Sequence, residues 1–81
     1  MTSADVRGLV EFLVRGLVDH PEVVTVRATE RDRTLSIEVR VAPDDVGKVI
    51  GRRGRIVSAI RTLARAASTP GGRRVIVEIV Q

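Results

Sequence analysis

Two glycines three residues apart, Gly51 and Gly54, interrupt a stretch of sequence whose apolar spacing is otherwise helical. Before them, Pro43 stands where a first helical turn accepts proline, and apolar residues follow at the spacing of one helix face. A glycine in a helix interior costs about 1 kcal/mol relative to alanine, so we expect the helix to break here. A second helix is predicted from Gly54 or Arg55. Its predicted inward-facing residues are Ile56, Ala59, Ile60, Leu63 and Ala67.

An amphipathic helix is predicted near the start of the chain, over residues 3–19. Apolar side chains recur there every three or four residues, and oppositely charged residues stand four apart. Ser3 suits the N-cap position. The His20-Pro21 pair should end the helix, because the residue before a proline avoids helical backbone angles.

Three strands complete the predicted elements. Residues 22–30 and 33–41 alternate between apolar and polar side chains and are joined by a short polar turn, which indicates an antiparallel hairpin. Residues 68–72 contain one proline and two glycines and are predicted to form a loop, and 74–80 form a last strand rich in Val and Ile. The predicted order is helix, strand, strand, helix, helix, strand, which is an α+β pattern.

Composition restricts the classes of function. A length of 81 residues with 43% apolar content suits one small domain, so we expect a single domain over residues 1–81. The chain has no cysteine and one histidine, which excludes structural zinc, thiol catalysis and a Ser/His/Asp triad in their usual forms. We therefore expect no metal, no cofactor and no enzymatic activity. No signal-peptide pattern or membrane-spanning apolar run is evident, which favours a cytoplasmic protein without membrane insertion.

Charge is distributed unevenly along the chain, although the net charge is only +4. Residues 1–45 contain six arginines and nine acidic residues, a net charge of −3, whereas residues 46–81 contain eight basic residues and one acid, a net charge of +7. This asymmetry indicates a polyanionic partner, although a solvated face would have the same charges. Phe12 is the only aromatic residue, so RRM, OB and cold-shock modules, which stack bases on aromatic side chains, are excluded.

The Gly51-Arg52-Arg53-Gly54 segment has the features of a loop that binds a sugar-phosphate backbone. The helix after it presents unpaired backbone N–H groups and a partial positive charge at its start. Glycine allows a phosphate to approach those groups closely, and Arg52 and Arg53 supply positive charge. An ordinary helix-helix turn with solvated arginines is the simpler alternative.

Other chemical interpretations of this region fit less well. A nucleotide-hydrolysing P-loop needs Ser or Thr after its lysine, but Lys48 is followed by Val49, and the glycine spacing differs from the Rossmann fingerprint. Asp44 and Asp45 point about 100° apart on a helix, so they do not converge on a metal or a substrate. We interpret both as residues that complement the positive end of the helix.

The segment Val49-Ile50-Gly51-Arg52-Arg53-Gly54-Arg55-Ile56 resembles the Val-Ile-Gly-x-x-Gly-x-x-Ile core of K-homology (KH) domains, although Ile56 follows Gly54 by two positions instead of three. The element order is similar to the type II KH arrangement. A chain of this length resembles the small bacterial RNA-binding proteins of the KhpA family, which consist of one KH domain. The resemblance implies three helices packed on one face of a three-stranded mixed sheet.

The same resemblance implies that the loop clamps about four nucleotides of single-stranded RNA, with an aliphatic groove of Val49, Ile50, Ile56 and Ile60 beneath the bases. The residues expected to bind RNA are Lys48, Val49, Ile50, Gly51, Arg52, Arg53, Gly54, Arg55, Ile56 and Ile60. Single-stranded DNA stays open as a ligand, because no residue visibly recognises a 2′-OH.

Partners and physiological role follow only from the resemblance. It implies a homodimer, an association with a larger KH-containing protein, or both, and a role as a post-transcriptional regulator or RNA chaperone connected with cell shape. The alternative is a ribosome-assembly or dimerisation scaffold with incidental nucleic-acid affinity. In that case the stripe formed by Gly8, Phe12 and Gly16 should matter more than Arg52 and Arg53.

Overall fold

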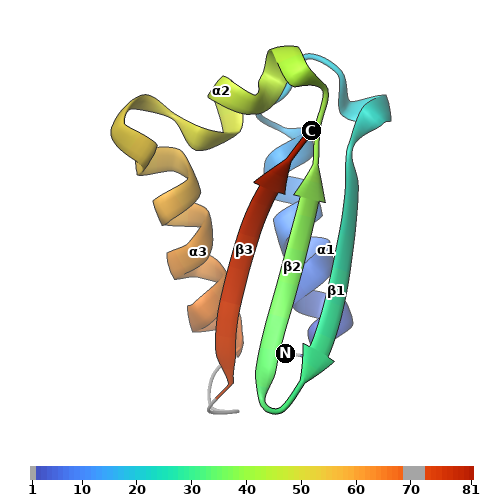
Figure 1. Cartoon of the computed structure of the whole chain (residues 1–81), viewed down its shortest axis with the longest axis vertical. Coiled ribbons are helices and arrows are strands. Elements are labelled where there is room, and N and C mark those ends of the chain that lie inside the picture. The colour runs from blue at the N-terminus through green and yellow to red at the C-terminus, as the bar shows by residue number, and fades with distance from the viewer. Residues whose placement is uncertain (1, 69–72) are drawn as a thin grey trace.

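Helices cover one face of a three-stranded sheet in the computed structural model, which describes residues 2–68 and 73–81 (Figure 1). The elements in chain order are α1 (Ser3–Arg15), the 3-10 turn η1 (Pro21–Val23), β1 (Thr25–Arg31), β2 (Thr34–Arg40), the 3-10 turn η2 (Pro43–Asp45), α2 (Val46–Ile50), the 3-10 turn η3 (Arg52–Gly54), α3 (Arg55–Ser68) and β3 (Arg74–Val80). The predicted α+β order and the layers of a type II KH fold are confirmed. The loop predicted over residues 68–72 lies mostly outside the described residues.

The sheet is mixed, with the strand order β1-β2-β3. β1 and β2 are antiparallel, and β2 and β3 are parallel, so Ile37 of β2 stands between Ala28 and Val77. The Arg74 N–H donates to the carbonyl of Arg33. The backbone N–H and carbonyl groups of residues 74, 76, 78 and 80 therefore point toward β2. The backbone groups of residues 75, 77 and 79 consequently face the open edge of the sheet.

The hydrophobic core lies between the sheet and the helices. α1 contributes Val6, Val10 and Val14, which have no exposed surface, and β2 contributes the alternate residues of its inward face. The predicted alternation of the second strand is therefore confirmed. Small branched side chains dominate this core, and they pack the helices closely onto a short sheet.

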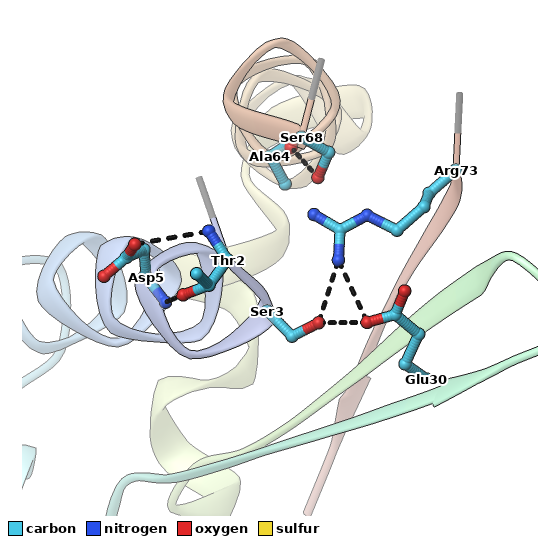
Figure 2. Close-up of polar contacts among 7 residues, drawn as sticks. All are labelled: Thr2, Ser3, Asp5, Glu30, Ala64, Ser68 and Arg73. Carbon is cyan, nitrogen blue, oxygen red and sulfur yellow. Dashed lines mark hydrogen bonds and ion pairs between the residues drawn. The ribbon is translucent and has the colours of Figure 1, made fainter. Parts of the chain in front are cut away.

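The predicted inward face of α3 is confirmed only in part: Ile60 is buried, and Ile56 and Ala67 pack against the core. The buried residues are Val57, Ile60, Ala64 and Ser68, whereas Ala59 and Leu63 are exposed. Apolar residues occupy more of the circumference of α3 than the core covers, so periodicity alone did not locate the centre of the buried face. Ser68 is tolerated in the core because its hydroxyl donates to the Ala64 carbonyl at 2.9 Å (Figure 2).

The first helix begins at residue 3 as predicted, but its N-cap residue and its C-terminal end differ from the prediction. The N-cap is Thr2 and not Ser3: its hydroxyl accepts the Asp5 N–H, and the Asp5 carboxylate accepts the Thr2 N–H (Figure 2). The helix ends at Arg15 and does not continue to residue 19. The first strand begins at Thr25, after the η1 turn. None of the helices in the described part of the chain is long and apolar enough to cross a membrane.

Asp45 fixes the segment that follows the first helix. Its side chain is fully buried and accepts the backbone N–H groups of Asp19 and His20 at 3.1 and 3.0 Å. A carboxylate 25 or 26 residues away therefore holds residues 19 and 20 in the connection between α1 and β1. Asp45 stands at the N-cap position of α2, at the helix start as predicted, but its carboxylate makes no capping hydrogen bond to α2.

The pKa of Asp45 lies below its ordinary value. Burial opposes ionisation, but hydrogen bonds from the backbone N–H groups of Asp19 and His20 and from the Lys48 ammonium outweigh it. A carboxyl group with a lowered folded-state pKa stabilises the fold above its unfolded pKa of about 3.9. That contribution is lost as the pH falls through the lower folded-state pKa.

We expect Asp45→Ala to lower the midpoint of thermal unfolding at neutral pH by about 10 °C, because two enclosed N–H groups lose their acceptor. The exposed neighbour provides the control: Asp44→Ala should change the midpoint by less than about 3 °C. Circular dichroism melts from pH 7 down to pH 2 give both results. Asp45→Asn should lose less stability across the acid range than the unmodified chain does, and equal losses would contradict this role.

Candidate nucleic-acid interface

The predicted break between the two helices is present and depends on positive backbone φ angles. α2 ends at Ile50, and Gly51 adopts φ 79° and ψ 170°, a conformation that other residues rarely enter. Arg53 and Gly54 follow with φ values of 58° and 72°, and the Gly54 N–H donates to the Gly51 carbonyl at 3.1 Å. The segment forms one tight turn that leads directly into α3.

The two glycines have different physical roles. A Cβ on Gly51 would lie 2.5 Å from Cγ1 of Ile56 and 2.9 Å from its backbone nitrogen, so Gly51 permits α3 to pack closely against the end of α2. A Cβ on Gly54 would meet no atom within 4 Å. The space beside Gly54 is open, so the backbone of a ligand has access to the start of α3 there.

Positive charge surrounds this open space. Arg52, Arg53 and Arg55 are exposed, and within the described part of the chain none of them forms a salt bridge. On α1, by contrast, Glu11 pairs with an arginine on either side. The loop arginines therefore present uncompensated charge to solvent.

Lys48 differs from the arginines that follow it. Its ammonium lies 3.2 Å from the Asp19 carboxylate and 3.4 Å from that of Asp45. A hydrogen bond to Asp19 is the main reason that the pKa of Lys48 is raised. Lys48, one of the predicted RNA-binding residues, is thus tied to Asp19 in the connection between α1 and β1. The carboxylates of Asp19 and Asp45 offset its positive charge.

The predicted aliphatic groove residues divide into two pairs. Val49 and Ile60 are buried, with 0% and 3% of their surface exposed, and belong to the core. Ile50 and Ile56 are half-buried, so part of each side chain remains accessible at the surface. Only Ile50 and Ile56 have accessible surface that a base could contact, whereas Val49 and Ile60 pack beneath them in the core.

A groove between α3 and β3 was not predicted. The two elements run in opposite directions and lie closer together where α3 ends and β3 begins than at their other ends (Figure 1). A hollow of about 540 Å³ lies between them and is lined by Arg61, Arg65, Arg73, Arg74, Val75, Ile76, Val77 and Glu78. Nη2 of Arg61 donates to the Val77 carbonyl, on the open edge of β3, at 3.2 Å.

Arg73 fixes one end of this groove. Its Nη1 donates to Ser3 Oγ at 2.8 Å and to the Glu30 carboxylate at 3.0 Å, and Ser3 donates to the same carboxylate (Figure 2). The hydrogen bond from Ser3 is the main reason that the pKa of Glu30 is lowered. The cluster joins the starts of α1 and β3 to the end of β1, so the Arg73 side chain is directed inward.

A second hollow of about 370 Å³ lies on the uncovered face of the sheet. Arg27, Glu38 and Glu78 are among its lining residues. Its carboxylates repel a polyanion, so the loop and the α3/β3 groove are the better candidate for a nucleic-acid interface.

Comparison with known proteins is consistent with this geometry. The family model described as "KhpA/KhpB, KH domain" matches residues 7–79. The chain is 49% identical over 72 residues to the RNA-binding protein KhpA of Caldanaerobacter subterraneus, covering 89% of this chain and 96% of the relative. It is 49% identical over 78 residues to the RNA-binding protein KhpA of Mycobacterium bovis, covering 96% and 94%.

A solved structure supports the fold. A crystal structure of Aquifex aeolicus Era aligns with a TM-score of 0.61 at 22% sequence identity. The alignment covers 91% of this chain and 29% of the Era chain. The arrangement of helices and strands described above is therefore also present in part of a larger protein.

Proposed function

Because the chain belongs to the KhpA/KhpB family of KH domains, we propose that it binds single-stranded RNA through the Gly51–Gly54 loop and the groove between α3 and β3. The relatives are named RNA-binding proteins, which supports RNA as the ligand. The observation that carries the role of the loop is the open space beside Gly54, bordered by exposed arginines without salt bridges among the described residues.

Each part of the interface has its own role in this proposal. Arg52, Arg53 and Arg55 pair with phosphates, while the N–H groups at the start of α3 approach the RNA backbone beside Gly54. The exposed parts of Ile50 and Ile56 support the bases in place of aromatic rings, held from behind by Val49 and Ile60. Lys48 contributes to the positive potential but binds RNA less directly, because it is engaged by two carboxylates.

The open edge of β3 gives the bases polar partners. The backbone N–H and carbonyl groups of residues 75, 77 and 79 are not used within the sheet, and hydrogen-bonding edges of unstacked bases have the donors and acceptors to match them. The Val77 carbonyl already accepts a hydrogen bond from Arg61, so a base that donates to this carbonyl must displace the Arg61 side chain or share the acceptor with it.

The salt dependence of RNA binding tests the proposal. Three or four phosphate contacts at about 0.7 counterions each predict a slope of log K against log salt concentration of about −2 to −3. Fluorescence anisotropy with a labelled single-stranded RNA of four nucleotides, from 50 to 300 mM salt, provides the measurement. A slope near zero would exclude phosphate recognition, and equal affinity for the DNA of the same sequence would extend the ligand to single-stranded nucleic acid in general.

We also propose that the chain acts in the cytoplasm as a post-transcriptional regulator or RNA chaperone, paired with a second copy or with a larger KH-containing protein. A footprint of about four nucleotides gives weak affinity, which a second linked domain raises through effective concentration.

The second candidate function is a dimerisation scaffold. Two apolar side chains, Phe12 and Leu63, are 75% and 47% exposed, which favours it. Light scattering on the purified chain distinguishes a monomer from a dimer.

A further inference from the structure

A cluster of arginines lies at the end of the groove away from the Gly51–Gly54 loop. Arg61 and Arg65 stand four residues apart on α3, and Arg74 begins β3 across the groove. Glu78 is the only acidic residue that lines this hollow. We refer to Arg65 and Arg74 as the far-end cluster; Arg61 is excluded because its guanidinium donates to the Val77 carbonyl within the groove, and Arg73 because Ser3 and Glu30 hold its guanidinium.

The charges of the far-end cluster are not compensated within the described part of the chain. No salt bridge there involves Arg65 or Arg74. Like charges at i and i+4 destabilise a helix by a few tenths of a kcal/mol, and α3 contains no acidic residue to offset Arg61 and Arg65. Arginines that form no salt bridge within the described part of the chain can pair with an anionic ligand.

The far-end cluster is too distant to act on the phosphates held at the loop. Ten residues separate Arg55 from Arg65 on α3, which at a helical rise of 1.5 Å per residue is about 15 Å. The Debye length at physiological salt is about 8 Å. Any phosphate that Arg65 or Arg74 contacts is therefore a different one, further along a strand that enters the hollow between α3 and β3.

We propose that the far-end cluster is a second phosphate-binding subsite, which contacts the RNA backbone beyond the nucleotides held at Gly51–Gly54 and sets the length of the footprint. This inference depends on the proposed function, because it requires the same RNA strand to enter the groove at the loop. The subsite favours RNAs of more than four nucleotides without adding any base contact.

The test compares Arg65→Gln/Arg74→Gln with the unmodified chain on single-stranded RNAs of four and eight nucleotides. Each RNA is compared between proteins, so the larger number of binding registers on the longer RNA cancels. Two phosphate contacts on a single strand, at about 0.7 counterions each, are worth about tenfold in affinity at 0.15 M salt. We expect the variant to bind the eight-nucleotide RNA about tenfold more weakly, with a salt slope less steep by about 1.4. Its affinity for the four-nucleotide RNA should be unchanged within about twofold.

Two matched variants control for charge and for folding. Arg15→Gln/Arg27→Gln removes the same charge from exposed positions on α1 and β1 and should leave both affinities within about twofold. Arg65→Lys/Arg74→Lys keeps the charge and should retain most of the affinity for the longer RNA. Thermal melts verify that all variants are folded.

The outcomes separate the inference from the proposed function. Equal weakening on both RNAs would assign the arginines to the loop-bound nucleotides and overturn the second subsite, as would no weakening on either. Polyglutamate bound as tightly as the eight-nucleotide RNA, through the same two arginines, would overturn the assignment to RNA. If the unmodified chain binds neither RNA, the proposed function itself fails, and the inference fails with it.

Discussion

Gly51→Ala should lower the free energy of unfolding by about 3 kcal/mol, a large fraction of the stability of a domain this small. Two costs combine at this position. The φ of 79° with ψ of 170° belongs to a region of backbone space that is essentially restricted to glycine. The added methyl group would also lie 2.5 Å from Cγ1 of Ile56 and 2.9 Å from its backbone nitrogen, so the start of α3 would have to move.

The other glycines of this region provide matched controls for the same methyl group. Gly47 lies in α2, where a Cβ would meet nothing within 4 Å, so Gly47→Ala should be neutral or stabilise by up to about 1 kcal/mol. Gly54→Ala has open space but a φ of 72°, and should cost about 1 kcal/mol. Urea denaturation followed by circular dichroism ranks the three variants. A Gly51→Ala variant as stable as Gly47→Ala would show that α2 and α3 do not require this contact.

The sequence was most informative where one local cause determines the structure. Alternation in residues 33–41 predicted β2 and its inward face, because the period of a strand assigns side chains to faces directly. The spacing of Gly51 and Gly54 predicted the break between α2 and α3 for a similar reason: helix continuation is a local preference. In both regions the chain's own backbone preferences and the final packing agree.

Prediction failed where distant segments decide the outcome. Nothing near Asp45 in the sequence indicates that its carboxylate accepts N–H groups from residues 19 and 20 and fixes the connection after α1. The apolar stripe on α3 was too wide to show which residues face the core, since α1 and β3 together determine that. The contribution of β3 to the groove was not predicted. The order of strands in the sheet places β3 at an open edge, and the alternation of residues within β3 does not reveal that order. The spacing of Arg61 and Arg65 without an intervening acid was the available indication.

The second large effect should come from charge reversal in the loop. We expect Arg52→Asp/Arg53→Asp to weaken binding to a four-nucleotide single-stranded RNA by about 100-fold at 0.15 M salt, because two phosphate contacts are lost and two repulsive charges replace them. Asp suits this loop, since Arg53 has a φ of 58° and Asp tolerates left-handed backbone better than most residues. Anisotropy titrations give the affinity, and a melt gives the stability of the same sample.

The β1–β2 turn offers a closely matched control for this reversal. Arg33 has a φ of 60°, close to that of Arg53, and Arg31 and Arg33 are both exposed. The turn between β1 and β2 lies at the end of the molecule away from α2 (Figure 1). Arg31→Asp/Arg33→Asp changes the net charge by the same amount but should weaken four-nucleotide binding by less than about threefold, because the site is more than a Debye length from the loop. If both double variants weaken RNA equally, binding depends on net charge alone. If the loop variant stays folded and keeps its affinity, RNA does not bind at the loop, and the groove beside α3 would have to hold the strand without it.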